Sequence, residues 1–519
     1  MTKLNRGSVV FALVFAWKIA LFLLSAQPVP ANDSFFYDGP VVNRILNGRY
    51  CNPSIAIAFP ISGTEVYSCY PPLHQLGLLG WMLLFGTSVQ AAIAFHLVLF
   101  GIYMLLLLGI LNRLRAPPWS VAIAGGFVLV LTFHDRPDSL AHVLGMLGVY
   151  AMIRSRRLFS YPGEKAPSRA WAWLMAASMV LTLCTSLQIG ATYFGLIVLA
   201  LGGMFWMQPE PLPLAPLAFA ALAPVALVAM VKFGFPHLWQ GFQEHARQTP
   251  SVTGLRVPYL SEIIKIVRAV PGVFLAALLA LVLWSRRSQF TVPLARAGLA
   301  ILISTVVIAL GIVVLSSLLL TANTIAIATY LQPLAAAVCL ALCAQMLSGR
   351  YLLKTAVICF VAGFLINSTR AIGMSTWGLA CARDVSCGTA IHCVSDELNR
   401  QPQGSLVVLS SAYLYEAARH RNVRWIHSDW LMPASRIPAD ELDMQGLTVR
   451  RPNELILTQF DYYRRFQLVL ERLKSDPRLV DMHIENTAHV RAPDSYKSLQ
   501  RVVQHISWPP VIVTLNWKQ

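Results

Sequence analysis

Charged residues are scarce in this sequence. Asp, Glu, Lys and Arg together make up 13% of its 519 residues, whereas hydrophobic residues make up 56%. In ordinary soluble domains about a quarter of the residues are charged, so this scarcity excludes a typical soluble protein of this size. Long apolar runs occupy the first 373 positions instead, and they predict a polytopic membrane protein.

Acidic residues are missing from these apolar runs. None of the eleven predicted membrane helices contains Asp or Glu, and Lys18 is the one charge in the middle of a run. An ion-coupled carrier usually needs ionisable groups near the midplane and often has repeated halves. Neither feature is visible, which argues against such a carrier. The eleven ranges are 8–27, 88–111, 119–133, 139–153, 171–187, 190–207, 214–232, 270–284, 297–321, 325–347 and 355–373.

Zinc-binding cysteine motifs are also missing. Cys381, Cys387 and Cys393 are spaced six residues apart, which does not match a zinc site. Cys51 and Cys69 share one predicted outer loop, where an oxidising compartment permits a disulfide. The sequence leaves open which of these five cysteines pair.

Positive charge is concentrated in the short connectors between the predicted helices. If the N-terminus is cytoplasmic, the inner connectors carry fourteen Lys and Arg residues and the longer outer loops carry seven. The positive-inside rule then places residues 28–75 and everything after Gly373 outside the inner membrane. The net charge of +17 is spread over these connectors rather than gathered in one patch, which argues against nucleic acid as a partner.

A polar stretch, residues 28–75, lies between strongly apolar neighbours. It contains Asp33, Asp38 and Glu65. The first two follow a membrane helix within six residues of each other, so their carboxylates are predicted to lie at the bilayer surface. There a carboxylate can perform acid/base chemistry on the head group of a lipid-linked substrate.

A second acidic turn, residues 134–138, joins two predicted helices of about 15 residues. Each would rise about 22 Å, less than the hydrocarbon core of about 30 Å, so the turn is expected at or slightly below the outer head groups. Pro137 suits a first helical turn, which places Asp138 at a helix N-terminus where the dipole favours the ionised carboxylate. Two interpretations stay open: a catalytic base, or a helix cap in which Asp135 or Asp138 pairs with Arg136.

Two segments are predicted to lie in the membrane interface. Residues 73–86 are apolar but too short to span the bilayer, and residues 261–269 alternate apolar with charged side chains, as an interfacial helix does. Lys265 and Arg268 on the second segment suit either a substrate phosphate or simple contact with anionic membrane lipid.

The last 146 residues have the composition of a soluble domain, with seventeen basic and fifteen acidic residues. Short β-rich runs at 405–411, 423–427 and 455–459 alternate with helical stretches, of which 461–474 is the clearest. We therefore predict a small α/β domain over residues 374–519.

Three sequence elements occur together at the expected outer positions. They are Asp33 with Gly48 fifteen residues later, the turn Tyr70-Pro71-Pro72-Leu73, and Arg136-Pro137-Asp138. With them the chain resembles glycosyltransferases of the GT-C fold, in the broad group of protein mannosyltransferases and aminoarabinose transferases that use polyprenyl-phosphate sugars. The resemblance implies a mainly α fold, a polytopic membrane bundle of about eleven helices, residues 1–373, with a C-terminal α/β domain outside.

The resemblance also implies a reaction and a set of site residues. A hexosyl- or pentosyltransferase would move a sugar from polyprenyl phosphate to a lipid, glycan or protein acceptor, inverting the anomeric carbon. Such chemistry needs a carboxylate and cations but no cofactor; the sequence does not decide whether a divalent metal takes part. Asp33 is expected as general base, Asp138 or failing that Asp135 as second acid, Arg136, Lys265 and Arg268 at the donor phosphate, and His74, Tyr70 and Asp38 as further substrate contacts.

One position departs from the pattern. Many relatives have Asp-Glu where this chain has Asp33-Ser34. Asp38 either takes the place of the second acid or is an ordinary loop residue.

A non-enzymatic class competes with the transferase, namely a lipid or polysaccharide transporter with an external binding domain. Lys18 and the number of helices favour it. The lack of acids within the membrane runs, and their concentration in two outer loops, favours the transferase.

Overall fold

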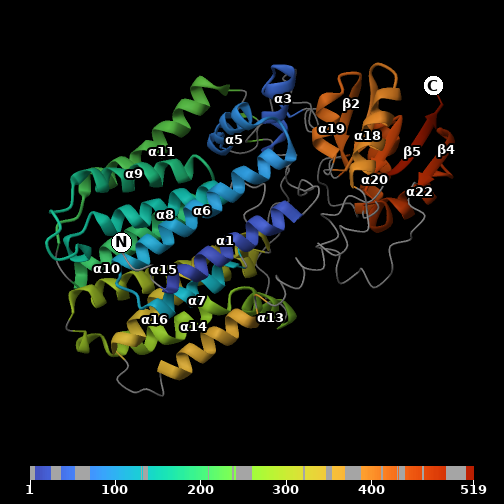
Figure 1. The fold of residues 1–519 in the computed structure, drawn as a ribbon. Coiled ribbons are helices and arrows are strands. Elements are labelled where there is room, and N and C mark those ends of the chain that lie inside the picture. The colour runs from blue at the N-terminus through green and yellow to red at the C-terminus, as the bar shows by residue number, and fades with distance from the viewer. Residues whose placement is uncertain are drawn as a thin grey trace.

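A bundle of apolar helices carries a small α/β domain at one end (Figure 1). The structure is a computed structural model, and the residues it describes are 6–24, 37–52, 71–129, 131, 138–207, 210–236, 239–240, 243, 260–290, 292–319, 322–346, 353–366, 368, 387–410, 413–428, 431, 439–458, 461–486 and 510–518. The expected domain boundary at Gly373 lies outside these residues and stays a prediction.

Each of the eleven predicted membrane ranges holds a helix. They are α1 (Arg6–Leu24), α6 (Val89–Arg113), α7 (Pro118–Leu129), α8 (Asp138–Arg154), α9 (Arg169–Leu183), α10 (Leu187–Met207), α11 (Leu214–Gly234), α14 (Pro271–Ser285), α15 (Pro293–Leu319), α16 (Ala322–Met346) and the helix Leu353–Ile366. Within the described residues, α6, α10, α11, α15 and α16 are long and apolar enough to cross a membrane. The prediction of an integral membrane protein with a mainly α fold is confirmed.

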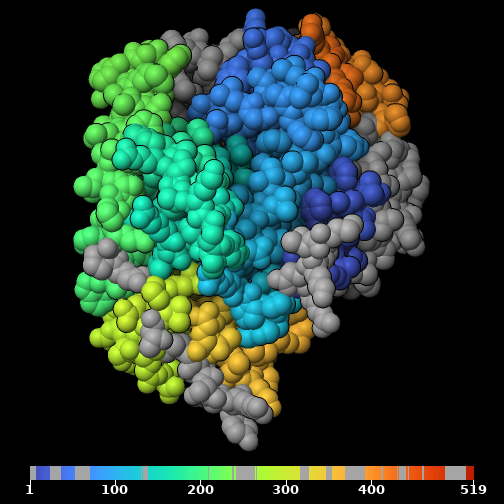
Figure 2. Space-filling view, turned by 60° about the vertical axis from the view of Figure 1, so that its left-hand side comes forward, coloured from blue at the N-terminus to red at the C-terminus, as the bar shows by residue number. Residues whose placement is uncertain are grey.

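The helices differ in how deeply they sit in the bundle. In the most apolar 18-residue stretch of α16, 89% of the residues are buried, whereas in α11 the share is 11%. The run Ala335-Ala336-Ala337 is fully buried in α16, and small side chains of this kind let membrane helices approach closely. Figure 2 shows α11, in green, along the outer edge of the bundle beside the turquoise helices. The core of the bundle therefore lies around α16, away from α11.

Three shorter helices lie at the end of the bundle that carries the α/β domain. The two segments predicted as interfacial helices are helical, as α5 (Leu73–Phe85) and α13 (Leu260–Ala269), and their place in the membrane interface stays a prediction. The third, α3 (Gly39–Asn47), was not predicted inside the polar stretch. Pro40 lies in its first turn, and Gly48 ends it with a left-handed φ of 75°, the usual pairing of proline at a helix start and glycine just beyond its end.

The α/β domain has a five-stranded sheet. The strands are β1 (Ser405–Leu409), β2 (Val423–His427), β3 (Glu454–Leu457), β4 (Leu479–Asn486) and β5 (Val511–Trp517), in the order β2-β1-β3-β5-β4. The three predicted strands are confirmed as the parallel part of the sheet, whereas β4 and β5, which pair antiparallel, were not predicted. The helices of this domain are α18 (Cys387–Arg400), α19 (Leu414–Arg419), α20 (Ala439–Arg450), the π-helical turn η5 (Tyr462–Phe466) and α22 (Gln467–Leu473).

The α/β domain contacts the bundle through α19 and α3. The hydroxyl of Tyr415 donates a hydrogen bond of 2.8 Å to Oδ2 of Asp38, and both side chains are buried. Arg421 donates to the side-chain oxygen of Asn47 at 3.0 Å and to the carbonyl of Leu46 at 2.8 Å. The domain is therefore attached to the polar stretch that also contains Asp33.

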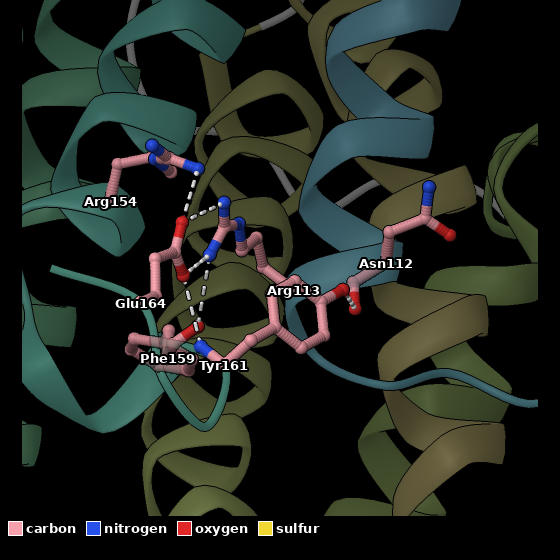
Figure 3. A network of polar contacts seen from close by, with 6 residues as sticks. All are labelled: Asn112, Arg113, Arg154, Phe159, Tyr161 and Glu164. Carbon is pink, nitrogen blue, oxygen red and sulfur yellow. Dashed lines mark hydrogen bonds and ion pairs between the residues drawn. The ribbon is translucent and has the colours of Figure 1, made fainter.

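A polar network joins helix ends at the opposite end of the bundle (Figure 3). Arg113 at the end of α6 donates two hydrogen bonds to the carboxylate of Glu164, at 2.5 and 2.8 Å, and Arg154 at the end of α8 donates a third at 3.3 Å. The backbone N–H of Tyr161 donates to the same carboxylate at 2.9 Å. That N–H, followed by the guanidinium of Arg113, holds the pKa of Glu164 below its ordinary value. Glu164 thus ties the connector between α8 and α9 to two membrane helices.

Candidate functional site

The site residues predicted from the sequence are only partly described. Asp33, Tyr70, Asp135 and Arg136 lie outside the described residues, and so does the side chain of Lys265 on α13. Asp138, Arg268, His74 and Asp38 are described. Their positions, and those of their neighbours, define the candidate site at the end of the bundle that carries the α/β domain.

Asp138 is the first residue of α8, as the sequence predicted. Its side chain is half-buried. A carboxylate in the first turn of a helix is stabilised in its charged form by the helix dipole. Asp138 therefore combines a place at a helix N-terminus with a side chain that is only half-buried, at one end of the bundle.

A buried serine and two stacked histidines lie next to the first turn of α8. Ser139, next to Asp138, forms a hydrogen bond of 2.6 Å with Nδ1 of His96 on α6. The ring of His96 stacks on that of His74 on α5, with 5.4 Å between the ring centroids. All three side chains are buried. The residue that follows Asp138 is thus held by His96 of α6, and His96 in turn packs against His74 of α5.

His74 was expected to contact a substrate, and the structure places it among aromatic rings. It meets Tyr37 edge-on at 6.4 Å between centroids and lies 5.8 Å from Phe95. Neither ring nitrogen has a hydrogen-bond partner among the described residues. Burial lowers the pKa of His74 to about 3, because removing a charged imidazolium from water is costly. The ring is therefore neutral near pH 7, and its role at a substrate stays a prediction.

A second buried cluster lies one turn further along α8. His142 stacks on Tyr330 of α16, with 3.8 Å between centroids and 11° between the ring planes. Its Nδ1 lies 3.1 Å from the hydroxyl of Tyr193 on α10. The hydroxyl of Tyr103 on α6 donates to the carbonyl of Tyr330 at 2.6 Å. These contacts join α6, α8, α10 and α16 one helical turn further into the bundle than Asp138.

Gln332 fixes the end of the interfacial helix α13. Its side-chain oxygen accepts a hydrogen bond of 3.0 Å from the backbone N–H of Gly272, and its Nε2 donates to the carbonyl of Ala269 at 3.2 Å. Gln332 is fully buried in α16, so it anchors α13 to the most buried helix of the bundle. Arg268, in the last turn of α13, is exposed.

Lys18 and Asp38 are both engaged within the protein. Lys18 of α1 donates a hydrogen bond of 3.1 Å to the carbonyl of Leu131, so this lysine faces the bundle rather than lipid. Asp38 is 1% exposed and accepts the hydrogen bond from Tyr415. Its role as a substrate contact or a replacement second acid stays a prediction. Among the residues the structure describes, no group of three or more His, Cys, Asp or Glu side chains could hold a metal ion.

No protein-family model matches this sequence, and no curated protein matches it. The fold, however, has similar solved structures. ArnT from Cupriavidus metallidurans bound to undecaprenyl phosphate is 14% identical, with 97% of each chain covered and a TM-score of 0.54. The same protein in its apo state gives 14% identity, the same coverage and a TM-score of 0.50. The chain has the GT-C fold.

An archaeal oligosaccharyltransferase, AglB from Archaeoglobus fulgidus, is less similar. It is 12% identical to this chain, the match covers 88% of this chain and 70% of AglB, and the TM-score is 0.48. The GT-C assignment rests on the two ArnT structures, whose 97% coverage includes both the bundle and the α/β domain.

Sequence reasoning did not single out several polar residues of the GT-C bundle. His96, His142 and Gln332 lie in predicted membrane helices, and Ser139 directly follows Asp138. A signal for the two histidines was available, because ionisable residues inside membrane helices usually face the bundle interior and mark functional regions. No comparable signal pointed to Ser139, since serine is common in helix first turns.

Proposed function

We propose that this protein is a membrane glycosyltransferase that transfers a sugar from a polyprenyl-phosphate donor to an acceptor at the outer face of the inner membrane. The observation that supports the proposal is the position of Asp138, a half-buried carboxylate at a helix N-terminus, at the end of a GT-C bundle that carries the α/β domain. The similar ArnT structure contains undecaprenyl phosphate, which supports a polyprenyl phosphate as the lipid carrier here.

The proposed reaction is a single displacement. An acceptor hydroxyl or amine attacks the anomeric carbon, the bond from that carbon to the phosphate oxygen breaks, and polyprenyl phosphate leaves with the bonding electrons. Asp33 takes the proton of the acceptor as general base. Asp138 orients the acceptor or the cations around it, and Asp135 is the alternative for this role. Displacement from the opposite side inverts the anomeric configuration.

The developing negative charge on the phosphate needs fixed positive charge nearby. Arg136, Lys265 and Arg268 are proposed to provide it. Gln332 supports this arrangement because it anchors α13, the helix that carries Lys265 and Arg268. The hydrogen bond between Ser139 and His96 holds the turn that contains Asp138.

The proposed topology follows from the same account. The N-terminus lies in the cytoplasm, and the bundle of residues 1–373 carries the domain of residues 374–519 on the outer side. The network around Glu164 then lies at the cytoplasmic end, where the basic connectors were expected.

Turnover of a labelled donor tests this proposal. The purified protein is placed in lipid nanodiscs with undecaprenyl phosphate that carries a radiolabelled hexose or pentose, together with an extract of cell-envelope lipids and glycans as acceptor. We expect loss of the donor and transfer of label to the acceptor fraction, and Asp33→Asn should lower the rate at least about 100-fold.

Two results would count against the proposal. Label that crosses the bilayer on intact donor, without cleavage, would favour the transporter. Transfer by Asp33→Asn at the wild-type rate would remove Asp33 as the base.

A further inference from the structure

A groove opens between the first turns of α7 and the helix Leu353–Ile366. Its volume is about 490 Å³, which is within the range of roughly 300–1,000 Å³ that is common for small-molecule sites. The groove lies at the end of the bundle opposite the α/β domain, since both helices begin there (Figure 1). It is thus separate from the candidate transfer site.

The lining of the groove is apolar apart from one residue. It consists of Trp119, Ala122, Ile123, Leu353, Lys354, Val357 and Ile358. The apolar members repeat every three to four positions on both helices, so each helix presents one face to the groove. Trp119 lies in the first turn of α7, and tryptophan is enriched where a membrane helix meets the head groups. The lining fits a hydrocarbon chain that enters at the level of the head groups.

Positive charge is present at the mouth of the groove. Lys354 is exposed there. Both helices also begin at this end, and the dipole of a helix places partial positive charge at its N-terminus, which favours anions. An apolar groove beside one exposed lysine and the starts of two helices is complementary to a lipid that has an anionic head group.

We propose that this groove binds one anionic glycerophospholipid, with an acyl chain between α7 and Leu353–Ile366 and the phosphate near Lys354. Charge complementarity selects this lipid over a zwitterionic one. The groove lies at the opposite end of the bundle from Asp138. Polyprenyl phosphate, which the proposed reaction releases near Asp138, is therefore a less suitable occupant than a membrane phospholipid. The inference does not depend on the proposed function.

Native mass spectrometry of the intact protein tests this site. The protein is extracted from nanodiscs made of equal parts phosphatidylglycerol and phosphatidylcholine, and the lipid that stays bound is identified. We expect one retained phosphatidylglycerol. Lys354→Gln should weaken its retention by about fivefold, because one lysine near a membrane surface contributes about that factor to anionic lipid binding.

Two further variants sharpen the test. Lys165→Gln removes an exposed lysine from the connector at the same end and should leave retention unchanged. Ala122→Trp fills the groove and should abolish retention of any lipid. Each of four results would overturn the proposal. Two concern affinity: equal retention of both lipids, or unchanged retention in Lys354→Gln. The other two concern the occupant: polyprenyl phosphate retained in place of phosphatidylglycerol, or a second copy of the protein seated on the groove.

Discussion

Asp138→Asn is expected to lower sugar transfer by at least about 100-fold while the protein stays folded and still binds its donor. Asparagine keeps the size of the side chain and its place in the first turn of α8, but it removes the negative charge. A positioned carboxylate that takes part in proton transfer or orients the reacting groups typically contributes 100-fold to 10,000-fold to the rate. The rate is measured with labelled undecaprenyl-phosphate sugar at saturating donor.

A matched control separates this effect from a general loss of charge. Asp440 lies on the surface of the α/β domain and pairs with Arg472 at 2.8 Å. Asp440→Asn should leave turnover within about twofold of wild type, because exposed ion pairs contribute little. If Asp138→Asn turns over as fast as Asp440→Asn, Asp138 has no part in the chemistry.

Glu454→Gln is expected to stabilise the α/β domain above pH 7 and to flatten its dependence on pH. Glu454 begins β3 and is 1% exposed, and Glu397 of α18 is its acidic neighbour. Burial, followed by the negative charge of Glu397 on α18, raises the pKa of Glu454 to about 9, although Arg400 opposes this shift. The folded domain therefore keeps this carboxyl protonated at neutral pH.

The sign of the effect on stability follows from proton binding. Between the unfolded pKa of 4.5 and the folded pKa of about 9, the folded state holds a proton that the unfolded state releases. The free energy of unfolding then falls as pH rises through this window, by at most about 1.4 kcal/mol for each pH unit. Glutamine is neutral at every pH, so the variant loses this slope.

Hydrogen exchange of the intact protein measures the effect locally. Protection of peptides from β3 and β5, corrected for the intrinsic dependence of exchange on pH, is compared at pH 6 and pH 8. Wild type should lose protection at the higher pH, and Glu454→Gln should keep it. Glu441→Gln, an exposed carboxyl on α20, should behave as wild type. The same loss in wild type and Glu454→Gln would show that Glu454 is not the titrating group.

The membrane helices were predictable because their signal is long and uniform. A run of apolar residues must satisfy its backbone hydrogen bonds internally in a bilayer, and a helix does so. The same reasoning failed for α3, whose nine residues lie in a polar stretch and bury Val41 and Val42 against neighbours far away in the sequence. It also failed for β4, in which Asp481, His483 and Glu485 alternate with apolar residues at an edge of the sheet.

The sequence predicted the acidic residues of the candidate site better than it predicted the residues that hold them in place. Asp138 at the start of α8 followed from Pro137 and the shortness of the flanking runs. The contact between Ser139 and His96 joins residues 43 positions apart, and the bond between Tyr415 and Asp38 joins residues 377 positions apart. Contacts over such separations depend on how the helices and the α/β domain pack, which the local sequence pattern does not encode.

The central claim is that Asp33 and Asp138, from separate outer turns, meet at one site for a lipid-linked sugar. A structure of the protein with an undecaprenyl-phosphate sugar bound tests it most directly. The account predicts the phosphate among Arg136, Lys265 and Arg268, with the anomeric carbon open to attack from the side of Asp33 and with Asp138 on the same cavity. A donor bound elsewhere, or the two aspartates facing different surfaces, would contradict it.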